Sequence, residues 1–391
     1  MIELHEALKI VLDTARPLGS ERVELDRAMN RVLAEDVVSD LDMPPFDRST
    51  VDGYACRRAD LAGKLSVIET IQAGVAPAKT LGPRQCAKIM TGAVVPQGAD
   101  CVVMVEQTEP AGGDAIRCRG RQTQDNICRR ADDVRTGQVV LKKGDRIRPQ
   151  QVAVLASVGC VRPLVARRPK VAVVATGDEL VDPTVKPGPS QLRNSNSPQL
   201  AAQLNALGVS PGDYGVVKDI EADIDRVLGT ALAENDVVLI SGGVSVGDFD
   251  FVPGALRRNR VRLLFERIAV KPGKPTLFGL TDHSYCFGLP GNPVSAFVIF
   301  ELLVKPFLFR LMGHVHSPVR IEMRLEEPVA RKDTERQSWI PVKLIGRNAV
   351  RPVEYHGSAH GLALCEADGL VPVDIGLASI EKGASVQVLL L

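Results

Sequence analysis

Short apolar runs alternate with helically spaced apolar residues in the second half of the chain. The runs are rich in branched aliphatic or aromatic residues, which is typical of strands buried on both faces of a sheet. The predicted strands are Lys170–Thr176, Asp236–Ile240 and Tyr285–Leu289. The predicted helices lie near 197–207, 221–233 and 297–312. Because strands and helices alternate, we predict an α/β domain at 169–316 with a doubly wound parallel sheet.

Two other stretches have a different pattern, in which short Val and Ile runs are separated by Gly, Pro and other turn residues. This pattern occupies 41–148 and returns at 317–391, and it predicts short strands rather than helices. The sequence therefore predicts a β-rich domain before the α/β domain and a small all-β domain after it.

The first 40 residues contain too few apolar positions to form a core of their own. Leu4, Leu8 and Val11 mark one face of a helix near the start of the chain. We expect residues 1–40 to pack with 149–168 as one discontinuous N-terminal domain. The β-rich stretch between these segments is then an insertion.

Composition and charge exclude several classes of protein. The 391 residues include 48 Lys and Arg against 47 Asp and Glu, and 45% are hydrophobic, which is typical of a folded globular chain. A net charge of +1 provides no field that would attract nucleic acid. The sequence predicts no membrane span and no signal peptide. The eight cysteines form no C-x-x-C pair, so we expect reduced thiols and a cytoplasmic location.

Three loops that follow the predicted parallel strands combine glycine with hydroxyl, amide or carboxyl groups. They are Thr176–Glu179, Ser241–Asp248 and Pro290–Ser295. One such loop is more often only a tight turn, but ligands of parallel α/β sheets bind where these loops converge. Three loops at one edge, with Lys271 and Lys274 expected nearby, predict a site for an anionic, phosphate-containing ligand. The chain lacks the glycine-rich signatures of nucleotide triphosphatases and dinucleotide-binding enzymes.

A second group of polar residues lies in the predicted β-rich domain. Asp47, Asp52, Asp132 and Asp133 occur in turn-like surroundings. One or two carboxylates combined with substrate phosphates are the usual ligands of Mg²⁺. Taken alone, however, Asp47 and Asp52 are better interpreted as residues that cap turns.

Histidine and tryptophan provide weaker candidates. His314 with His316, and His356 with His360, lack a third metal ligand nearby, so we predict solvated loop histidines. Trp339 is predicted to serve packing. No sequence signature of a catalytic nucleophile is present.

Seven motifs occur in the order that is typical of one known family. They are PPFDRSTVDGYA, IMTGAVVPQGADCVVMVE, VVATGDELV, RNSNSPQL, SGGVSVGDFDFV, VKPGKPTLFG and LPGNPVSA. Together they resemble the MoeA family of molybdopterin molybdenumtransferases, which includes the E domain of gephyrin, over nearly the whole chain. The resemblance implies a dimerisation domain formed by the N-terminal segments, a molybdopterin-binding α/β domain, an inserted β-rich domain and a barrel-like C-terminal domain.

The resemblance also implies a reaction, in which molybdate enters adenylylated molybdopterin in the presence of Mg²⁺ and AMP is released with the molybdenum cofactor. The carboxylates expected to be catalytic are Asp52, Asp133, Glu179, Asp219 and Asp250. Of these, Asp52 and Asp250 are expected to hold Mg²⁺. The residues expected to bind the pterin phosphate or molybdate are Thr91, Thr176, Gly177, Ser241, Gly242, Gly243, Ser245, Lys271, Lys274, Pro290, Gly291, Asn292, Pro293, Ser295, Arg336 and Ser358.

Three positions depart from the family pattern. Ala131 stands where the family commonly has glycine, Cys128 replaces a basic residue, and Pro341 stands where a second basic residue is usual. These departures weaken the expected basic contacts near Asp133 and Arg336. Molybdate and tungstate have the same shape and charge, so the sequence does not distinguish between them.

The resemblance implies an elongated homodimer with an active site shared between subunits, served by a molybdopterin adenylyltransferase and by molybdoenzyme acceptors. Two other functions remain open. A molybdopterin adenylyltransferase shares the α/β domain but is typically that domain alone. A gephyrin-like scaffold uses the same fold but does not need the acids and lysines present here.

Overall fold

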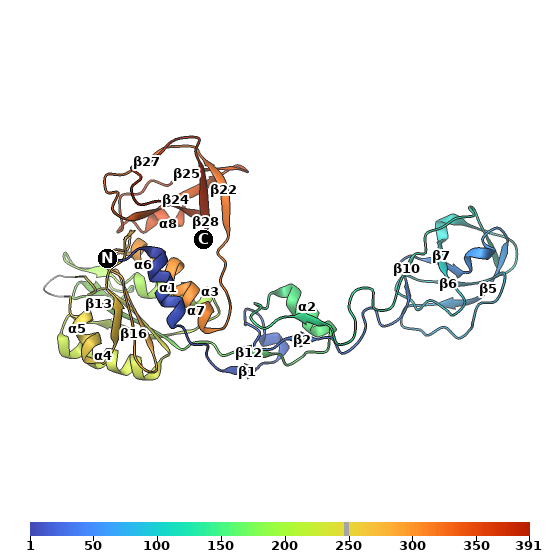
Figure 1. Cartoon of the computed structure of the whole chain (residues 1–391), viewed down its shortest axis with the longest axis horizontal. Helices are drawn as coiled ribbons and strands as arrows, with labels where there is room; N and C mark the ends of the chain where they lie inside the picture. Colours follow the sequence, from blue (N-terminus) through green and yellow to red (C-terminus); the bar gives the residue numbers. More distant parts are fainter. Residues whose placement is uncertain (246–249) are drawn as a thin grey trace.

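The computed structural model describes residues 1–245 and 250–391. The molecule is elongated (Figure 1), with the α/β domain and the C-terminal β domain at one end, a small module in the middle and a β-rich lobe at the far end. Within the described residues, no helix has both the length and the apolar character needed to cross a membrane.

The α/β domain is built on a six-stranded sheet. Its strands are β13 (Val171–Thr176), β16 (Pro211–Val217), β17 (Val237–Ser241), β18 (Arg262–Phe265), β20 (Leu277–Leu280) and β21 (Tyr285–Leu289). The order is β16-β13-β17-β21-β20-β18, and the first four strands are parallel. This confirms the doubly wound parallel sheet. The sequence did not reveal β20 and β18, which extend the sheet with antiparallel pairing.

Helices cover both faces of this sheet. One face packs against α4 (Glu221–Glu234) and α5 (Val252–Arg258). The other face packs against α1 (Leu4–Thr14), α3 (Asn196–Ala206), α6 (Pro293–Ile299), the π-helical segment η4 (Phe300–Val304) and α7 (Lys305–Leu311). Every residue of β13, β17 and β21 is buried, because successive side chains point to opposite faces and both faces are covered.

The first 40 residues pack in two places. In α1, Ala7 and Val11 are fully buried in the core of the α/β domain, in contact with η4 and α7. Residues further along instead contact 149–168 in the small middle module. Its elements are β1 (Ser20–Arg22) paired with β12 (Leu164–Ala166), η1 (Leu25–Arg27), β2 (Val37–Val38) paired with β11 (Val139–Leu141), and α2 (Pro149–Ser157). The division into domains at 40, 148, 168 and 316 stays a prediction.

The β-rich lobe lies between the two halves of the middle module in the sequence. Its strands are β4 (Gly53–Cys56), β5 (Lys64–Ile71), β6 (Gln85–Ile89), β7 (Cys101–Met104), β8 (Thr108–Pro110) and β9 (Ala115–Cys118), with the pair β3 (Arg48–Ser49) and β10 (Ile127–Cys128) and the short helices η2 (Arg58–Asp60) and η3 (Val105–Gln107). The six strands form one sheet in the order β7-β4-β6-β5-β9-β8. Two separate apolar clusters pack on it.

The C-terminal domain is a closed barrel. Its strands are β22 (Arg320–Leu325), β24 (Gln337–Ile345), β25 (Ala349–Pro352), β26 (Gly369–Val373) and β28 (Ser385–Leu390), with β23 (Val329–Ala330), β27 (Ser379–Ile380) and the short helix α8 (Leu362–Cys365) beside them. The barrel closes because β24 pairs with both β25 and β26. The strand β19 (Val270–Lys271) of the α/β domain pairs with β24 and joins the two domains. Trp339 is 2% exposed at this junction, which confirms its packing role.

Candidate active site

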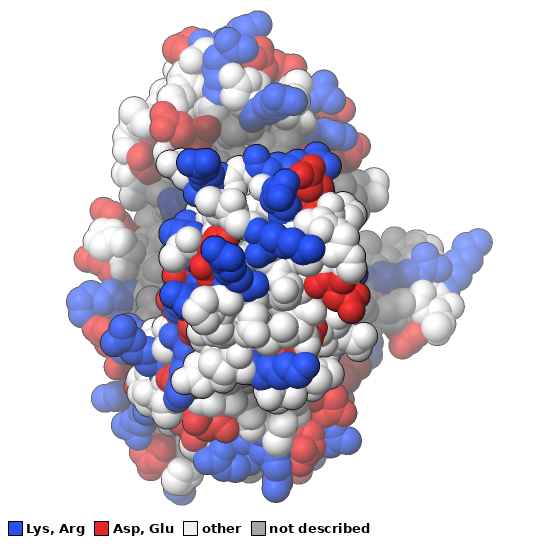
Figure 2. All heavy atoms as spheres, turned by 90° about the vertical axis from the view of Figure 1, so that its right-hand side faces the viewer, with Lys and Arg blue, Asp and Glu red and all other residues white. Residues whose placement is uncertain are grey.

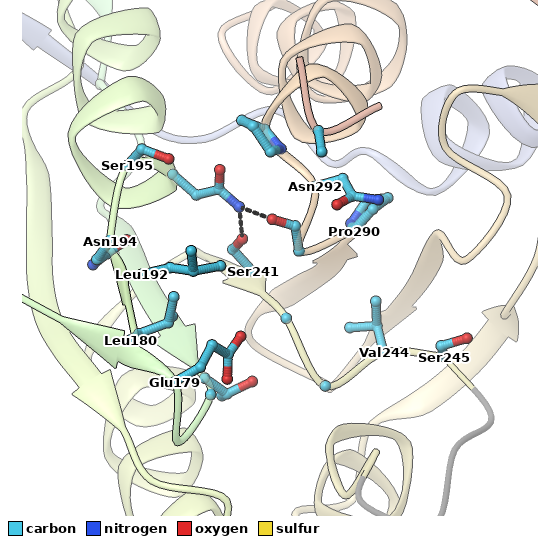
Figure 3. Close-up of a pocket in the computed structure, with 18 of the residues that line it drawn as sticks. Glu179, Leu180, Leu192, Asn194, Ser195, Ser241, Val244, Ser245, Pro290 and Asn292 are labelled. Atoms are coloured by element: carbon cyan, nitrogen blue, oxygen red, sulfur yellow. Dashed lines mark hydrogen bonds between the residues drawn. The ribbon is translucent and has the colours of Figure 1, made fainter. Parts of the chain in front are cut away.

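A cavity of about 850 Å³ lies at the carboxyl ends of β13, β17 and β21. It contains all three loops singled out in the sequence, and Figure 3 shows their side chains around a common space. The predicted site residues that line it are Thr176, Gly177, Glu179, Asp219, Ser241, Gly242, Gly243, Ser245, Asp250, Pro290, Gly291, Asn292 and Pro293. Val246, Gly247 and Asp248 of the second loop lie outside the described residues. The parallel topology therefore brings the loops together as expected.

The loop after β17 requires glycine at two consecutive positions. Gly242 and Gly243 have φ angles of +98° and +62°, a region that side chains disfavour. A Cβ atom at Gly242 would lie 2.3 Å from the backbone oxygen of Thr176, and one at Gly243 would lie 2.8 Å from the Thr176 Oγ1. The two glycines thus bring the backbone close to the end of β13, and the Gly242 N–H donates to the Leu289 backbone oxygen at 3.2 Å.

Asn196, which the sequence analysis did not single out, connects two of the three loops that line the cavity. Its Nδ2 donates to the Ser241 Oγ at 2.6 Å and to the Gly291 backbone oxygen at 2.8 Å. Within the described residues, the buried Asn196 Oδ1 and Thr176 Oγ1 have no hydrogen-bond partner. The RNSNSPQL motif was the available signal, but a sequence does not show which loops an amide joins.

Three carboxylates face the same cavity. Glu179, Asp219 and Asp250 all line it. Burial raises the pKa of Asp219, and the negative charges of Asp178, Glu179 and Asp250 raise it further. Carboxylates that destabilise one another's charge are typical of cation-binding or acid–base sites. Among the described residues, no three His, Cys, Asp or Glu side chains are arranged to hold a metal by themselves. A Mg²⁺ ion held by one or two carboxylates together with substrate phosphates would not need such a cluster.

The predicted basic residues lie at the junction with the barrel. Lys271 pairs with Ser338 through the β19–β24 ladder. The Arg336 guanidinium donates a hydrogen bond to the Asp333 carboxylate. This bond and the positive charge of Lys271 lower the pKa of Asp333. Lys274 is exposed one residue before Pro275, which lines the cavity.

The two predicted serines differ in their access to the cavity. The Ser358 Oγ accepts a hydrogen bond from Asn292 Nδ2 at 2.8 Å, so a loop of the barrel reaches the cavity rim. Ser295, in contrast, is 3% exposed in α6 and does not line the cavity.

The remaining predicted residues lie in the β-rich lobe, far from the cavity of the same chain (Figure 1). The Asp52 Oδ1 accepts hydrogen bonds from the Thr91 backbone N–H at 2.7 Å and from its Oγ1 at 2.9 Å, which lower the pKa of Asp52. Asp47 accepts from Arg129 and Arg130. Asp133 follows in the same loop, where its backbone N–H donates to Met43. Figure 2 shows positive and negative side chains interspersed on the outer end of this lobe.

Two of the loop histidines are packed rather than solvated. The His314 Nδ1 lies 2.7 Å from the Gly144 backbone oxygen, and His316 stacks on Phe309. Burial is the main reason that the pKa of His316 falls to about 4. The prediction of solvated histidines was wrong for this pair because a neighbouring aromatic ring covers it.

Comparisons with known proteins agree with the geometry. The MoeA N-terminal region (domain I and II) matches residues 2–159, a probable molybdopterin binding domain matches 172–310, and the MoeA C-terminal region (domain IV) matches 324–391. A molybdopterin molybdenumtransferase of Staphylococcus aureus (strain N315) is 34% identical over 100% of this chain and 95% of its own. One from Staphylococcus epidermidis is 38% identical over 80% of this chain and 76% of its own.

Solved structures extend the likeness to the whole fold. The molybdopterin biosynthesis moeA protein from Pyrococcus horikoshii OT3 has a TM-score of 0.86 and 31% identity over 100% of both chains. A second structure under a similar title has a TM-score of 0.82 and 33% identity over 100% of this chain and 99% of its own. The similarity includes the α/β domain, the inserted lobe and the barrel, and the chain therefore belongs to the MoeA family.

Proposed function

We propose that the protein inserts molybdate into adenylylated molybdopterin, releasing AMP and giving the molybdenum cofactor. The observation that carries the proposal is the single cavity in which a glycine cradle at Gly242 and Gly243 faces three carboxylates. Backbone amides and hydroxyls suit the phosphate groups of the substrate. The family membership and the names of the curated relatives support the same reaction.

Ser241 and Ser245, with the amide of Gly243, would bind the pterin phosphate, while the Gly242 N–H donates to the Leu289 backbone oxygen. Ser241 is 2% exposed, so Asn196 fixes the orientation of its hydroxyl group rather than leaving it to solvent. Because these donors are positioned before the ligand arrives, little reorganisation is needed when charge develops during cleavage of the phosphoanhydride.

Mg²⁺ fits the carboxylate wall of the cavity, and Asp250 is the residue there that would hold it. When bound, the ion would neutralise charge on the phosphoanhydride. Asp219 lies in the same wall, where burial and the neighbouring carboxylates raise its pKa. Asp52 would contribute its carboxylate from the β-rich lobe.

Lys271 and Lys274 would attract molybdate, which is a dianion, toward the cavity rim. Arg336 stands beside Lys271 at the barrel junction, and Ser358 adds a hydroxyl group through Asn292. The chemistry of this set does not separate molybdate from tungstate. The buried side chain of Ser295 would support α6 rather than contact the oxyanion.

The proposed active form is a cytoplasmic homodimer in which the β-rich lobe of one subunit faces the α/β cavity of the other. The separation of Asp52 and Asp133 from the cavity within one chain supports this arrangement (Figure 1). A two-fold dimer would carry two equivalent composite sites. A molybdopterin adenylyltransferase would supply the substrate, and molybdoenzymes would accept the product.

One assay tests the proposal against its alternatives. Purified protein is mixed with adenylylated molybdopterin and Mg²⁺, and AMP is measured with and without molybdate. We expect AMP release that depends on molybdate. Synthesis of adenylylated molybdopterin from ATP would identify an adenylyltransferase instead, and substrate binding without any turnover would identify a scaffold.

A further inference from the structure

One wall of the cavity is apolar and exposed. Leu192 is 63% exposed and Leu180 is half-buried, although leucine is normally among the most buried residues. Both line the cavity that contains Ser241 and Gly243. Figure 3 shows the two leucines next to each other on one side of the space, with Val244, Ser245 and Asn292 on the other side.

The two leucines are held in place by backbone pairing. The strands β14 (Leu180–Val181) and β15 (Leu192–Arg193) are parallel, and Leu180 is the direct partner of Leu192. Paired residues of neighbouring strands direct their side chains to the same face. The Leu192 N–H donates to the Glu179 backbone oxygen and the Asn194 N–H donates to the Val181 backbone oxygen, each at 2.8 Å. The apolar wall is therefore a built surface.

We propose that Leu180 and Leu192 form the surface on which the planar nitrogen heterocycle of the ligand packs. The inference deepens the proposed function and depends on it, because the reaction supplies two such rings, the pterin and the adenine of AMP. A cavity with an apolar wall at one side and a few fixed polar groups at the other is typical of sites for small amphipathic ligands. The apolar wall would bind the ring while the glycine cradle binds phosphate.

Burial of the ring removes apolar surface from water on both sides of the contact, so shortening one leucine reduces affinity for ligands that carry the ring. Shortening the leucine should not change the affinity for a ligand that carries the phosphate but lacks the ring. This difference separates a contact with the ring from a general disturbance of the cavity, which would weaken all anionic ligands together.

The test uses the full chain and calorimetric titration with three probes. AMP reports the adenine ring, ribose 5-phosphate reports the same phosphate without the ring, and pterin-6-carboxylate reports the pterin. For Leu192→Ala we expect affinity for AMP or for the pterin to fall about five- to tenfold, with ribose 5-phosphate unchanged. The ring that loses affinity identifies which heterocycle the wall binds.

Three further variants complete the design. Leu180→Ala should weaken the same ring ligand, Leu192→Met should retain most of the affinity, and Leu377→Ala, which shortens a leucine that is 48% exposed in the barrel domain, should change nothing. Light scattering of each variant shows whether its oligomeric state is that of the parent. A change of oligomeric state in Leu192→Ala without loss of ring affinity would mean that a partner subunit covers the wall, and would overturn the proposal.

The outcomes also separate this inference from the proposed reaction. If the parent releases AMP on addition of molybdate but both alanine variants bind the ring ligands normally, only the ring contact is wrong. If the variants lose ring affinity while the parent shows no molybdate-dependent AMP release, only the reaction is wrong. A parent that binds neither ring ligand overturns the ring contact directly.

Discussion

The α/β domain and the β-rich lobe hold their carboxylates in opposite ways. In the lobe, Asp42, Asp47 and Asp52 accept hydrogen bonds from neighbouring backbone and side chains, and these bonds lower the pKa of each group. In the cavity, burial and nearby negative charge raise the pKa of Asp219. Groups of lowered pKa stabilise the fold at neutral pH, whereas a carboxylate of raised pKa is held at a cost in stability.

This difference indicates where the chemistry is concentrated. Hydrogen bonds within the lobe account for the placement of the carboxylates of Asp42, Asp47 and Asp52. In the cavity, the Asp219 Oδ2 accepts a hydrogen bond from the Asp178 backbone N–H at 3.2 Å, but burial and neighbouring negative charge outweigh it and raise the pKa of Asp219. A ligand or cation would relieve this repulsion. The proposed dimer would bring Asp52 to the cavity of another subunit.

The largest effect is expected from filling the cradle of the α/β domain. In Gly243→Val, the new side chain would meet Thr176 Oγ1 and Val252 Cγ2 within 3 Å and would block the approach of phosphate. We expect pterin binding to weaken by about 100-fold or more. Gly383→Val is the control, because Gly383 also has a positive φ but has open space around it. Parental affinity in a folded Gly243→Val protein would show that the cradle does not bind the ligand.

Removal of one negative charge from the cavity and one from the lobe tests whether both regions supply a carboxylate to the metal site. Asp250→Asn in the cavity and Asp52→Asn in the lobe keep the shape of the side chain. Each should lower turnover about 100-fold and raise the Mg²⁺ concentration needed for half-maximal rate. Asp282→Asn, at the opposite edge of the sheet, should have no effect. An unchanged magnesium titration in Asp52→Asn would leave that residue with only its structural role.

Mixing two inactive proteins tests whether the lobe and the cavity belong to different subunits. Asp52→Asn and Lys274→Ala are combined under conditions that exchange subunits. In a mixed dimer with shared sites, one site receives both changes and the other receives neither, so roughly a quarter of the parental activity should return. Mixed dimers that form, as shown by differently tagged subunits, but remain inactive would place each site within one chain.

The pH dependence of stability tests the contrast in pKa directly. Because the pKa of Asp219 is raised in the folded protein, the native state keeps this proton more readily than the unfolded chain, and stability falls as the pH rises through the raised pKa. Asp219→Asn should therefore raise Tm at neutral pH, and the gain should vanish near pH 4, where the unfolded carboxyl is also protonated (about 3.9). Turnover should nevertheless fall about 10- to 100-fold.

Asp182 provides the opposite case. Hydrogen bonds from Thr184 lower the pKa of this exposed carboxyl, so its stabilising effect is present at neutral pH and is lost as the pH falls through the lowered pKa. Asp182→Asn should lower Tm at neutral pH and leave turnover unchanged. Melting curves of both variants between pH 4 and pH 8 measure the two signs. A loss of Tm in Asp219→Asn would contradict the assignment of strain to the cavity.

The α/β domain was predictable because its signals are local and its topology follows a rule. The runs at β13, β17 and β21 are apolar throughout, and the ends of parallel strands meet at one edge. The same rule is enough to bring the loops at Thr176 and Ser241 together from the order of the strands along the chain. The predicted C-terminal barrel and the predicted strands of the inserted stretch 41–148 were likewise confirmed.

Other features depend on partners that a sequence does not name. The helical pattern of Leu4 and Leu8 predicts an apolar face, but it does not show that α1 packs on α7 instead of the middle module. From the sequence, Leu192 resembles an ordinary core residue, and only the structure shows that its side chain is exposed. The separation of the β-rich lobe from the cavity follows from how the middle module positions it, which no residue pattern records.

The smallest effect concerns a departure from the family pattern in the lobe. Ala131 has a φ of +62°, within a turn where its N–H donates to the Pro44 backbone oxygen at 3.0 Å. This conformation destabilises an ordinary residue by about 1–2 kcal/mol. Glycine avoids this strain, but the greater entropy that it gives the unfolded chain offsets part of the gain. Ala131→Gly should therefore stabilise the lobe by about 0.5–1 kcal/mol and raise its unfolding midpoint by about 2–4 °C.

The sign of the stability change shows whether residue 131 lies in a left-handed turn or in regular structure. Ala153→Gly, in the exposed middle of α2, makes the same chemical change in a helix and should destabilise by about 0.5–1 kcal/mol. Differential scanning calorimetry of both variants compares the two signs in one experiment. If Ala131→Gly were destabilising by as much as Ala153→Gly, the turn would not hold its left-handed conformation in solution. The support that this loop gives to the lobe carboxylates would then have another source.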